Sequence, residues 1–222
     1  GCLKSERGAV SVTVKAGGEA GTVSVSGDKD GHIRGYIDGT CDGKLNGGTL
    51  TVIKDDGFSR PFVGTCELSG NDVSRNLMQY YDKSEQIPTA VSVGVKMRGG
   101  KCVAAGGVIM QLMPGTSEEN TDKAEERMQA FVDAADVVEK YGADGIITTF
   151  FGELSQSGAL YTTFPEYKCN CSRSKIEDVI KPLGAAELYK IIDEEGCVKV
   201  HCHYCNTDHV FTKTDIDELF KI

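Results

Sequence analysis

The chain has 222 residues, of which 40% are hydrophobic and 26% are charged, so it is long enough for one ordinary domain and a smaller second unit. Its 24 Lys and Arg against 33 Asp and Glu give a net charge of −9, which disfavours nucleic acid as a partner. No apolar run approaches the roughly 20 residues that cross a bilayer, and the chain starts Gly-Cys-Leu-Lys without a charged and then apolar leader. We therefore expect a soluble protein that is neither inserted into a membrane nor secreted.

In the first half, apolar and polar residues alternate with period two, which predicts antiparallel strands joined by turns. The expected strands lie near residues 10–14, 23–25, 32–37 and 50–53. A short helix is expected over residues 71–81, and two further strands over 90–97 and 102–113. Because these two strands are rich in Val, Ala and Gly, we expect them to pack closely against a helix.

The composition changes at Pro114-Gly115. Thr116-Ser117-Glu118-Glu119 matches a capping box, so a helix is expected to begin there. An apolar stripe continues this helix to Val138, and Gly142 is a stop signal. Residues 143–168 carry apolar side chains without a sustained period, and we interpret them as a linker. The alternative for its first part is one more amphipathic helix over residues 144–154.

After Tyr167, the pattern predicts helices over residues 174–180 and 185–194 and a β-hairpin over 198–211. A second capping box, Thr214-Asp215-Ile216-Asp217, predicts a short last helix. A unit of about 55 residues is too small for an apolar core alone to stabilise it reliably, so it needs an internal cross-link.

The expected fold is therefore α+β with three parts. Residues 1–115 form a mostly antiparallel sheet domain with packed helices, residues 116–168 form a helix and linker region, and residues 169–222 form a small metal-binding α+β domain.

The nine cysteines are unevenly placed: five lie between positions 169 and 205, and four are isolated, namely Cys2, Cys41, Cys66 and Cys102. A secreted disulfide scaffold is normally shorter than about 100 residues and has an even number of cysteines along its whole length. The chain meets neither condition. We expect a reducing compartment, the cytoplasm or, in a eukaryote, an organelle such as a mitochondrion or plastid, where isolated thiols serve as small core residues.

Four of the clustered cysteines form two close pairs, Cys169-Asn170-Cys171 and Cys202-His203-Tyr204-Cys205. Two such pairs separated by a helical insert can bring four thiolates around one Zn²⁺ per chain. The Cys-x-x-Cys spacing is common in zinc ribbons, whereas Cys-x-Cys is tighter than the usual spacing. The predicted metal ligands are Cys169, Cys171, Cys202 and Cys205.

Other potential ligands lie nearby. On a hairpin, His201 and His203 point to the face opposite Cys202, so we interpret them, and His209, as surface or supporting residues. Cys197 follows Gly196 at the start of a strand and is interpreted as a core or edge residue. A zinc deaminase is disfavoured because the chain lacks the His-x-Glu half of that signature.

All four predicted ligands are oxidisable sulfur, so oxidation to disulfides would expel the metal and unfold the unit. A permanent zinc-ribbon interaction module is the plainer alternative. A third hypothesis is a thiol–disulfide oxidoreductase using Cys202 and Cys205, but that chemistry needs a nucleophile at a helix N-terminus and this pair is expected on a hairpin. Because the chain also carries no Ser-His-Asp set, phosphate loop or dinucleotide fingerprint, no enzyme is expected.

Several segments resemble the 33-kDa heat shock protein family of redox-regulated holdase chaperones. In the first part these are residues 31–36, 48–55, 80–90, 105–107 and 111–115, including Ser84-Glu85-Gln86-Ile87-Pro88. In the tail they are Cys169-Asn170-Cys171-Ser172-Arg173 and His201-Cys202-His203-Tyr204-Cys205. The family also has an N-terminal strand and helix ahead of the region similar to Leu3, so we expect this chain to start inside the first domain.

The resemblance implies an ATP-independent holdase that is inactive while its four cysteines are reduced and hold zinc. Oxidants convert the pairs to disulfides, zinc leaves, the tail and linker unfold, and the protein binds unfolding client proteins and dimerises. The linker falls where the family has its metastable switch region, so its apolar side chains are the expected client-binding residues: Ile146, Ile147, Phe150, Phe151, Leu154, Leu160, Tyr161 and Phe164. The four isolated cysteines lie outside the family pattern and are assigned no redox role.

Overall fold

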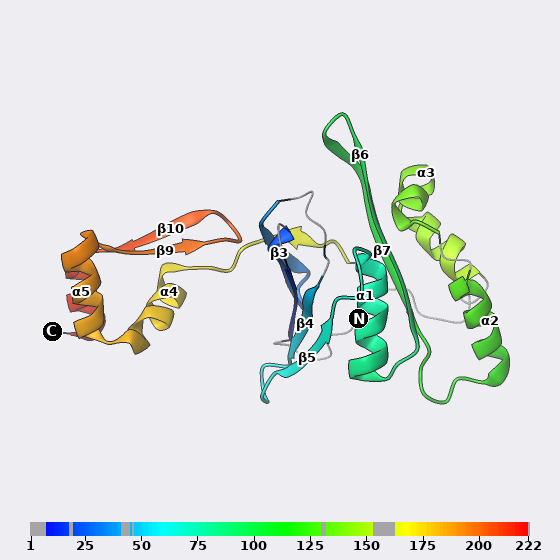
Figure 1. Ribbon diagram of the computed structural model, residues 1–222, viewed down its shortest axis with the longest axis horizontal. Coiled ribbons are helices and arrows are strands. Elements are labelled where there is room, and N and C mark those ends of the chain that lie inside the picture. The colour runs from blue at the N-terminus through cyan, green and yellow to red at the C-terminus, as the bar shows by residue number, and fades with distance from the viewer. Residues whose placement is uncertain are drawn as a thin grey trace.

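The computed structural model describes residues 8–17, 20–40, 45, 47–129, 132–152 and 163–221. The fold is α+β, as the sequence predicts, and Figure 1 shows an elongated molecule in which a small C-terminal unit projects from one edge of the main sheet. The strands are β1 (Ala9–Ala16), β2 (Thr22–Asp28), β3 (His32–Asp38), β4 (Gly48–Asp55), β5 (Phe62–Glu67), β6 (Thr89–Arg98), β7 (Lys101–Gln111), β8 (Glu166–Tyr167), β9 (Val198–Cys202) and β10 (Thr207–Phe211). The helices are α1 (Val73–Tyr80), α2 (Glu118–Gln129), α3 (Ala134–Ile146), α4 (Arg173–Ile180), α5 (Ala185–Glu195) and α6 (Lys213–Phe220), with short turns η2 (Tyr81–Glu85), η3 (Ile147–Phe151) and η5 (Lys181–Leu183).

The main sheet has six strands in the order β5-β4-β1-β2-β3-β8. Its first five strands pair antiparallel, and β8 adds to the edge of β3 in parallel. Period-two alternation puts the valines of β1 on one face, where Val14 joins a buried cluster with Leu50, Val52 and Tyr80. The opposite face of β1 carries hydroxyls such as Thr13, which lies 3.1 Å from the hydroxyl of Ser24.

The strands β6 and β7 form a long two-stranded hairpin against which α3 packs. Glycine allows this approach: a Cβ at Gly106 would lie 2.7 Å from a methyl group of Val138 and 3.1 Å from the carbonyl oxygen of Ala134. The predicted close packing of these strands against a helix is therefore confirmed. On the α3 side, Val108 and Phe150 belong to one buried cluster.

The helical region differs from the sequence prediction in three ways. The helix expected at a Thr116 capping box begins at Glu118, because Ser117 accepts from the Asn120 N–H at 3.4 Å, whereas the Thr116 hydroxyl donates to the carbonyl of Met113 at 2.6 Å. The expected single stripe is divided into α2 and α3, and Asp133 caps the second helix by accepting from the Ala135 N–H at 2.7 Å. Gly142 kinks α3 with φ 70° instead of ending it.

Residues 143–151, which the sequence analysis assigned to the linker, continue α3 and then form η3. The alternative of a helix docked on the first domain is thus correct for that stretch. Further along, β8 ties the chain to the sheet edge, since the N–H of Glu166 donates to Gly31 and that of Lys168 to Ile33, both at 2.9 Å. Among the described residues, no helix is long and apolar enough to cross a membrane.

The C-terminal unit has its own small core of Ile180, Leu188, Val198, Phe211 and Ile216, contributed by α4, α5, α6 and the β9–β10 hairpin. The last helix has a capping box, but its first residue is Thr212 and not Thr214. The Thr212 hydroxyl accepts from the N–H of Asp215, whose carboxylate accepts from the N–H of Thr212. A core of five buried residues in a unit of this size leaves stability to be supplied by a cross-link.

Candidate metal centre

The four predicted ligands meet at one point of the C-terminal unit. Their sulfur atoms all lie within 4.8 Å of one another, with Cys169 Sγ 3.7 Å from Cys202 Sγ and Cys171 Sγ 3.3 Å from Cys205 Sγ. A tetrahedron with metal–sulfur bonds of about 2.3 Å has sulfur–sulfur edges of about 3.8 Å. The sulfurs are therefore close enough to hold one metal ion, and the tight Cys-x-Cys spacing does not prevent it.

Local structure positions both pairs. Cys169 and Cys171 lie between β8 and α4, where Ser172 caps the helix by accepting from the Lys175 N–H at 3.3 Å. The backbone N–H of Cys171 points at the sulfur of Cys169 at 3.5 Å, a contact that fixes the position of this sulfur. Arg173 then fixes α4 to the rest of the unit by donating to the carbonyl of Val210 at 2.9 Å and pairing with the carboxylate of Asp215.

The second pair lies on the β9–β10 hairpin. Cys202 ends β9 and Cys205 lies in the turn, where Asn206 adopts a left-handed conformation with φ 56°. The N–H of Asn206 donates to the carbonyl of Cys202 at 2.8 Å, which closes the turn. Asn tolerates this conformation better than most residues, so the turn curls both sulfurs toward the same point.

The thiols differ in acidity because they share hydrogen bonds. The hydroxyl of Thr207 and then the thiol of Cys171 lower the pKa of Cys205 to about 6. The hydrogen bond with Cys205, followed by burial, raises the pKa of Cys171. Burial raises the pKa of Cys202, even though backbone N–H groups face its sulfur. The raised pKa values of Cys171 and Cys202 favour their protonated forms until a cation binds.

Metal affinity is therefore expected to fall as the pH falls. Since the raised pKa values keep Cys171 and Cys202 protonated at pH 7, each metal ion bound displaces at least two protons. Linkage then lowers the apparent affinity by about a hundredfold or more per pH unit, and Cys205 adds a third proton below about pH 6. Competition with a chromophoric chelator between pH 7 and 5 measures this slope. A slope below tenfold per unit would contradict the proton count.

The other candidate ligands stay outside the cluster, as the sequence analysis expected. His201 lies 2.7 Å from the carboxylate of Asp208, and the ring of His203 lies 5.2 Å from that of Tyr36. Cys197 is partly buried next to the first residue of β9, and neither it nor His209 belongs to the metal-ligating group.

The isolated cysteines divide differently from the prediction. Cys66 is a core thiol whose burial raises its pKa, as expected. Cys102 is exposed at the start of β7, where it pairs with Met97 beside the turn of the β6–β7 hairpin, so its assignment to the core was wrong. Cys2 and Cys41 lie outside the described residues.

Sequence reasoning missed the residue that joins this centre to the main sheet. Tyr204, between the two cysteines of the hairpin, contacts both β2 and β3. Its hydroxyl lies 3.3 Å from that of Ser24, its ring lies 4.6 Å below the guanidinium of Arg34, and Tyr36 meets it edge-on at 5.1 Å. The contact of Tyr204 with Ser24, 180 positions away, has no local signal in the sequence.

Tyr167 strengthens the same junction from the other cysteine pair. Its hydroxyl lies 2.9 Å from the carbonyl oxygen of Gly35 on β3 and 2.5 Å from that of Tyr204. Tyr167 is two residues before Cys169, and Tyr204 lies between Cys202 and Cys205. Both halves of the metal centre are therefore anchored to β3 within two residues of a sulfur ligand.

The predicted client-binding residues are distributed over different environments. Phe150 is 2% exposed, and Ile146 and Phe151 pack against the same cluster under the β6–β7 hairpin. Ile147 is half-buried, whereas Phe164, close before β8, is 88% exposed. Leu154, Leu160 and Tyr161 lie outside the described residues.

The sequence and the fold are both similar to those of known proteins. A family model described as Hsp33 protein matches residues 1–212. The 33 kDa chaperonins of Bacillus cytotoxicus and Bacillus mycoides are 35% and 36% identical, each over 99% of this chain and 80% of the relative. The crystal structure of the 33 kDa chaperonin (heat shock protein 33 homolog) of Thermotoga maritima has a TM-score of 0.79, covers 99% of this chain and 79% of that chain, and is 24% identical, so it shows the fold.

A sheet domain followed by a small four-cysteine unit, matched along its length by 33 kDa chaperonins, defines the protein as a chaperone. Within that class, the chain belongs to the Hsp33 family. The resemblance that rested on residues 80–90 and on the two cysteine pairs is thereby confirmed.

Proposed function

We propose that the protein is an ATP-independent holdase chaperone that oxidation switches on. The observation that carries this proposal is the convergence of four sulfurs within 4.8 Å. They lie where the main sheet meets the C-terminal unit, whose hydrophobic core is small. Four thiolates favour Zn²⁺, which when bound cross-links residues 169–171 to residues 202–205 and stabilises the unit. The reduced, zinc-bound form is the inactive state.

Activation is a two-electron oxidation of each cysteine pair. Two thiolates lose two electrons and form one sulfur–sulfur bond, while hydrogen peroxide accepts the electrons, breaks its oxygen–oxygen bond, takes up two protons and leaves as two waters. Two such events consume all four ligands. Zinc then has no thiolate to bind and leaves, because a disulfide sulfur is a poor ligand.

The disulfides of the active form join neighbours in sequence, Cys169 with Cys171 and Cys202 with Cys205. Cys171 and Cys205 are also close enough to pair, since their sulfurs lie 3.3 Å apart. A disulfide between them would keep residues 169–171 linked to residues 202–205, as bound zinc does, and would keep the unit folded. Sequence-adjacent disulfides close tiny loops and add little folding stability. The C-terminal unit therefore unfolds, and peptide mapping of the oxidised protein distinguishes the two pairings.

Unfolding then propagates to the client-binding surface. Loss of the hairpin turn removes Tyr204 from β2 and β3, and loss of β8 frees the edge of the main sheet. We propose that the apolar side chains ahead of the unit, from Ile146 to Phe164, then bind the exposed apolar segments of unfolding proteins, and that the active form is a homodimer. Phe150 and its neighbours take part only after η3 leaves the β6–β7 hairpin, because they are buried there.

Peroxide treatment of the reduced, zinc-loaded chain tests the proposal. One zinc per chain should be released together with the loss of four thiols, and the treated protein should suppress the aggregation of a chemically unfolded client. A chain that loses its zinc and thiols without protecting the client would refute the holdase assignment. Reduction of insulin by the zinc-free protein would instead support an oxidoreductase.

A further inference from the structure

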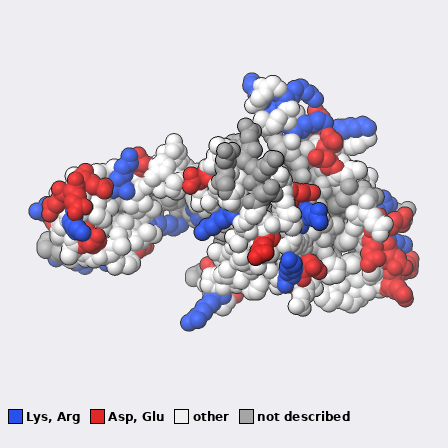
Figure 2. All heavy atoms as spheres, in the orientation of Figure 1, with Lys and Arg blue, Asp and Glu red and all other residues white. Residues whose placement is uncertain are grey.

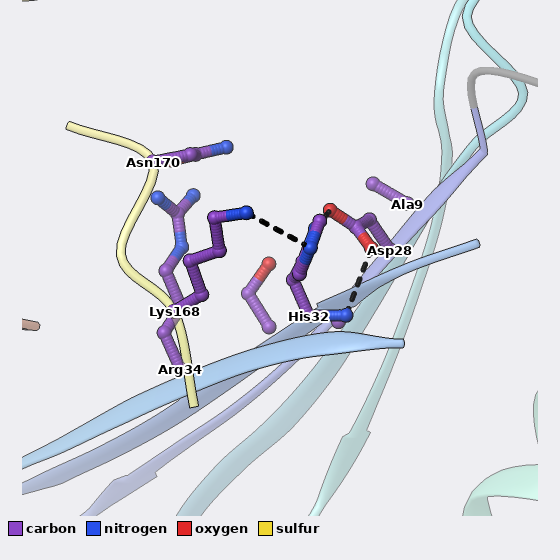
Figure 3. Close-up of a pocket in the computed structure, with 8 residues that line it drawn as sticks. Ala9, Asp28, His32, Arg34, Lys168 and Asn170 are labelled. Atoms are coloured by element: carbon purple, nitrogen blue, oxygen red, sulfur yellow. Dashed lines mark hydrogen bonds and ion pairs between the residues drawn. The ribbon is translucent and has the colours of Figure 1, made fainter. Parts of the chain in front are cut away.

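We propose that the chain has a binding site for a phosphate oxyanion at the junction between β3 and the segment that leads to the metal centre. The site is a cavity of about 210 Å³ whose polar lining is Ser26, Asp28, His32, Arg34, Lys168 and Asn170. Figure 3 shows Arg34, Lys168 and Asn170 together on one side of this cavity, with His32 and Asp28 opposite. The family match assigns no ligand to these residues.

Two uncompensated cations carry the inference. Among the described residues, no carboxylate lies within ion-pairing distance of Arg34 or Lys168, whereas Lys54 pairs with Glu85 and Lys96 with two carboxylates on α3. The chain as a whole has a net charge of −9, and acidic side chains dominate both ends of the face drawn in Figure 2. Adjacent cations that repel each other without a partner favour an anion between them.

The one carboxylate in the cavity is already engaged. Asp28 accepts from the backbone N–H groups of Asp30 and His32 and from Nδ1 of His32, each at 3.0 Å. Because Nδ1 of His32 donates to Asp28, its Nε2 is free to accept from the ammonium of Lys168 at 3.2 Å. The ring of His32 thus lies between Asp28 and Lys168, and the ammonium of Lys168 retains N–H donors for a ligand.

The donor set fits a phosphate better than a metal or an apolar ligand. The guanidinium carbon of Arg34 lies 4.6 Å from the centroid of the Tyr204 ring, a contact that uses none of its N–H donors, and a guanidinium can bind an oxyanion through two of them. Lys168 contributes a point charge, and the amide of Asn170 and hydroxyl of Ser26 are neutral donors within the same cavity. An oxyanion with several acceptor oxygens can use all four.

Such an anion would connect the two sides of the junction. Arg34 belongs to β3, and Lys168 immediately precedes Cys169, so an anion bound to both holds the metal-binding unit against the sheet. This consequence rests on the proposed redox switch, and it predicts that phosphate slows peroxide-driven zinc release at constant ionic strength. Binding itself does not depend on that switch.

The test is a titration of the reduced, zinc-loaded full chain with inorganic phosphate, followed by NMR, against sodium chloride at matched ionic strength. We expect a saturable shift of signals from residues around the cavity, and binding at least tenfold weaker in Arg34→Gln and in Lys168→Gln. The matched controls, Arg60→Gln and Lys181→Gln, remove the same charges from exposed positions outside the cavity and should bind as the parent chain does.

ADP serves as a second probe for the source of the phosphate. Tighter binding of ADP through the same two residues supports an organic phosphate ligand, and equal or weaker binding supports free phosphate. The site is refuted if phosphate causes no saturable change beyond that of chloride, or if both glutamine variants bind phosphate with the affinity of the controls.

Discussion

Replacing Cys205 by serine is expected to abolish zinc binding and unfold the C-terminal unit. The Sγ of Cys205 is one of four sulfurs within 4.8 Å, and a serine hydroxyl is a far weaker ligand for Zn²⁺ than a thiolate. Structural zinc contributes on the order of 10–16 kcal/mol in small peptides, against about 5–15 kcal/mol for the stability of a whole domain. Zinc content should fall from one per chain to none, and amide signals of the unit should collapse to unfolded positions.

Cys197→Ser is the matched control, since it changes the same residue type in the same unit but outside the sulfur cluster. It should keep one zinc per chain and the folded spectrum. The sheet domain, whose core around Leu50 and Tyr80 is separate, should remain folded in both variants. A Cys205→Ser chain that retains stoichiometric zinc and a folded C-terminal unit would show that the cluster is not the cross-link.

Tyr204→Ala is expected to make the reduced, zinc-loaded chain active without an oxidant. The change removes the ring that contacts Arg34 and Tyr36 and the hydroxyl next to Ser24, but none of the sulfur ligands. One aromatic pair and one cation–π contact together contribute about 1–3 kcal/mol, so their loss should shift the docking equilibrium by roughly tenfold or more. Client aggregation assays in the presence of reductant, with zinc content measured in parallel, check this result.

Tyr204→Phe provides the graded control. It keeps the ring over β3 and loses only the hydroxyl contact with Ser24, so its activity under reducing conditions should stay near that of the parent chain. If Tyr204→Ala retains zinc and is as inactive as the parent chain, the contact of Tyr204 with the sheet does not restrain the chaperone. That result would leave the metal centre intact and remove the proposed link between it and the client-binding surface.

Local patterns were sufficient for most of the elements. Alternating valines in β1 identify a half-buried strand, and glycines at positions such as Gly106 indicate close packing by a helix. The wrong predictions concern helix N-termini, where several neighbouring hydroxyl groups could each act as the N-cap. Ser117 rather than Thr116 accepts at the start of α2, and Thr212 rather than Thr214 caps α6, because the chain path decides which hydroxyl meets a free N–H.

The composition of the sulfur cluster was also predictable, because thiolate chemistry favours the residue type and spacing of Cys169, Cys171, Cys202 and Cys205. What the sequence could not reveal is where this centre docks. The contacts of Tyr204 with Ser24 and of Tyr167 with Gly35 join residues more than 130 positions apart, and no local period encodes such pairs.

By itself, the sequence determined that the fold is α+β with a sheet and that two cysteine pairs come together near the C-terminus, since these follow from short-range periodicity and ligand chemistry. Only the tertiary structure decided that β8 and Tyr204 fasten the C-terminal unit to β3, and that Arg34 and Lys168 line one cavity in which no carboxylate of the described residues forms an ion pair with either. Such contacts depend on how the whole chain folds back on itself, because packing and uncompensated charge are properties of neighbours in space.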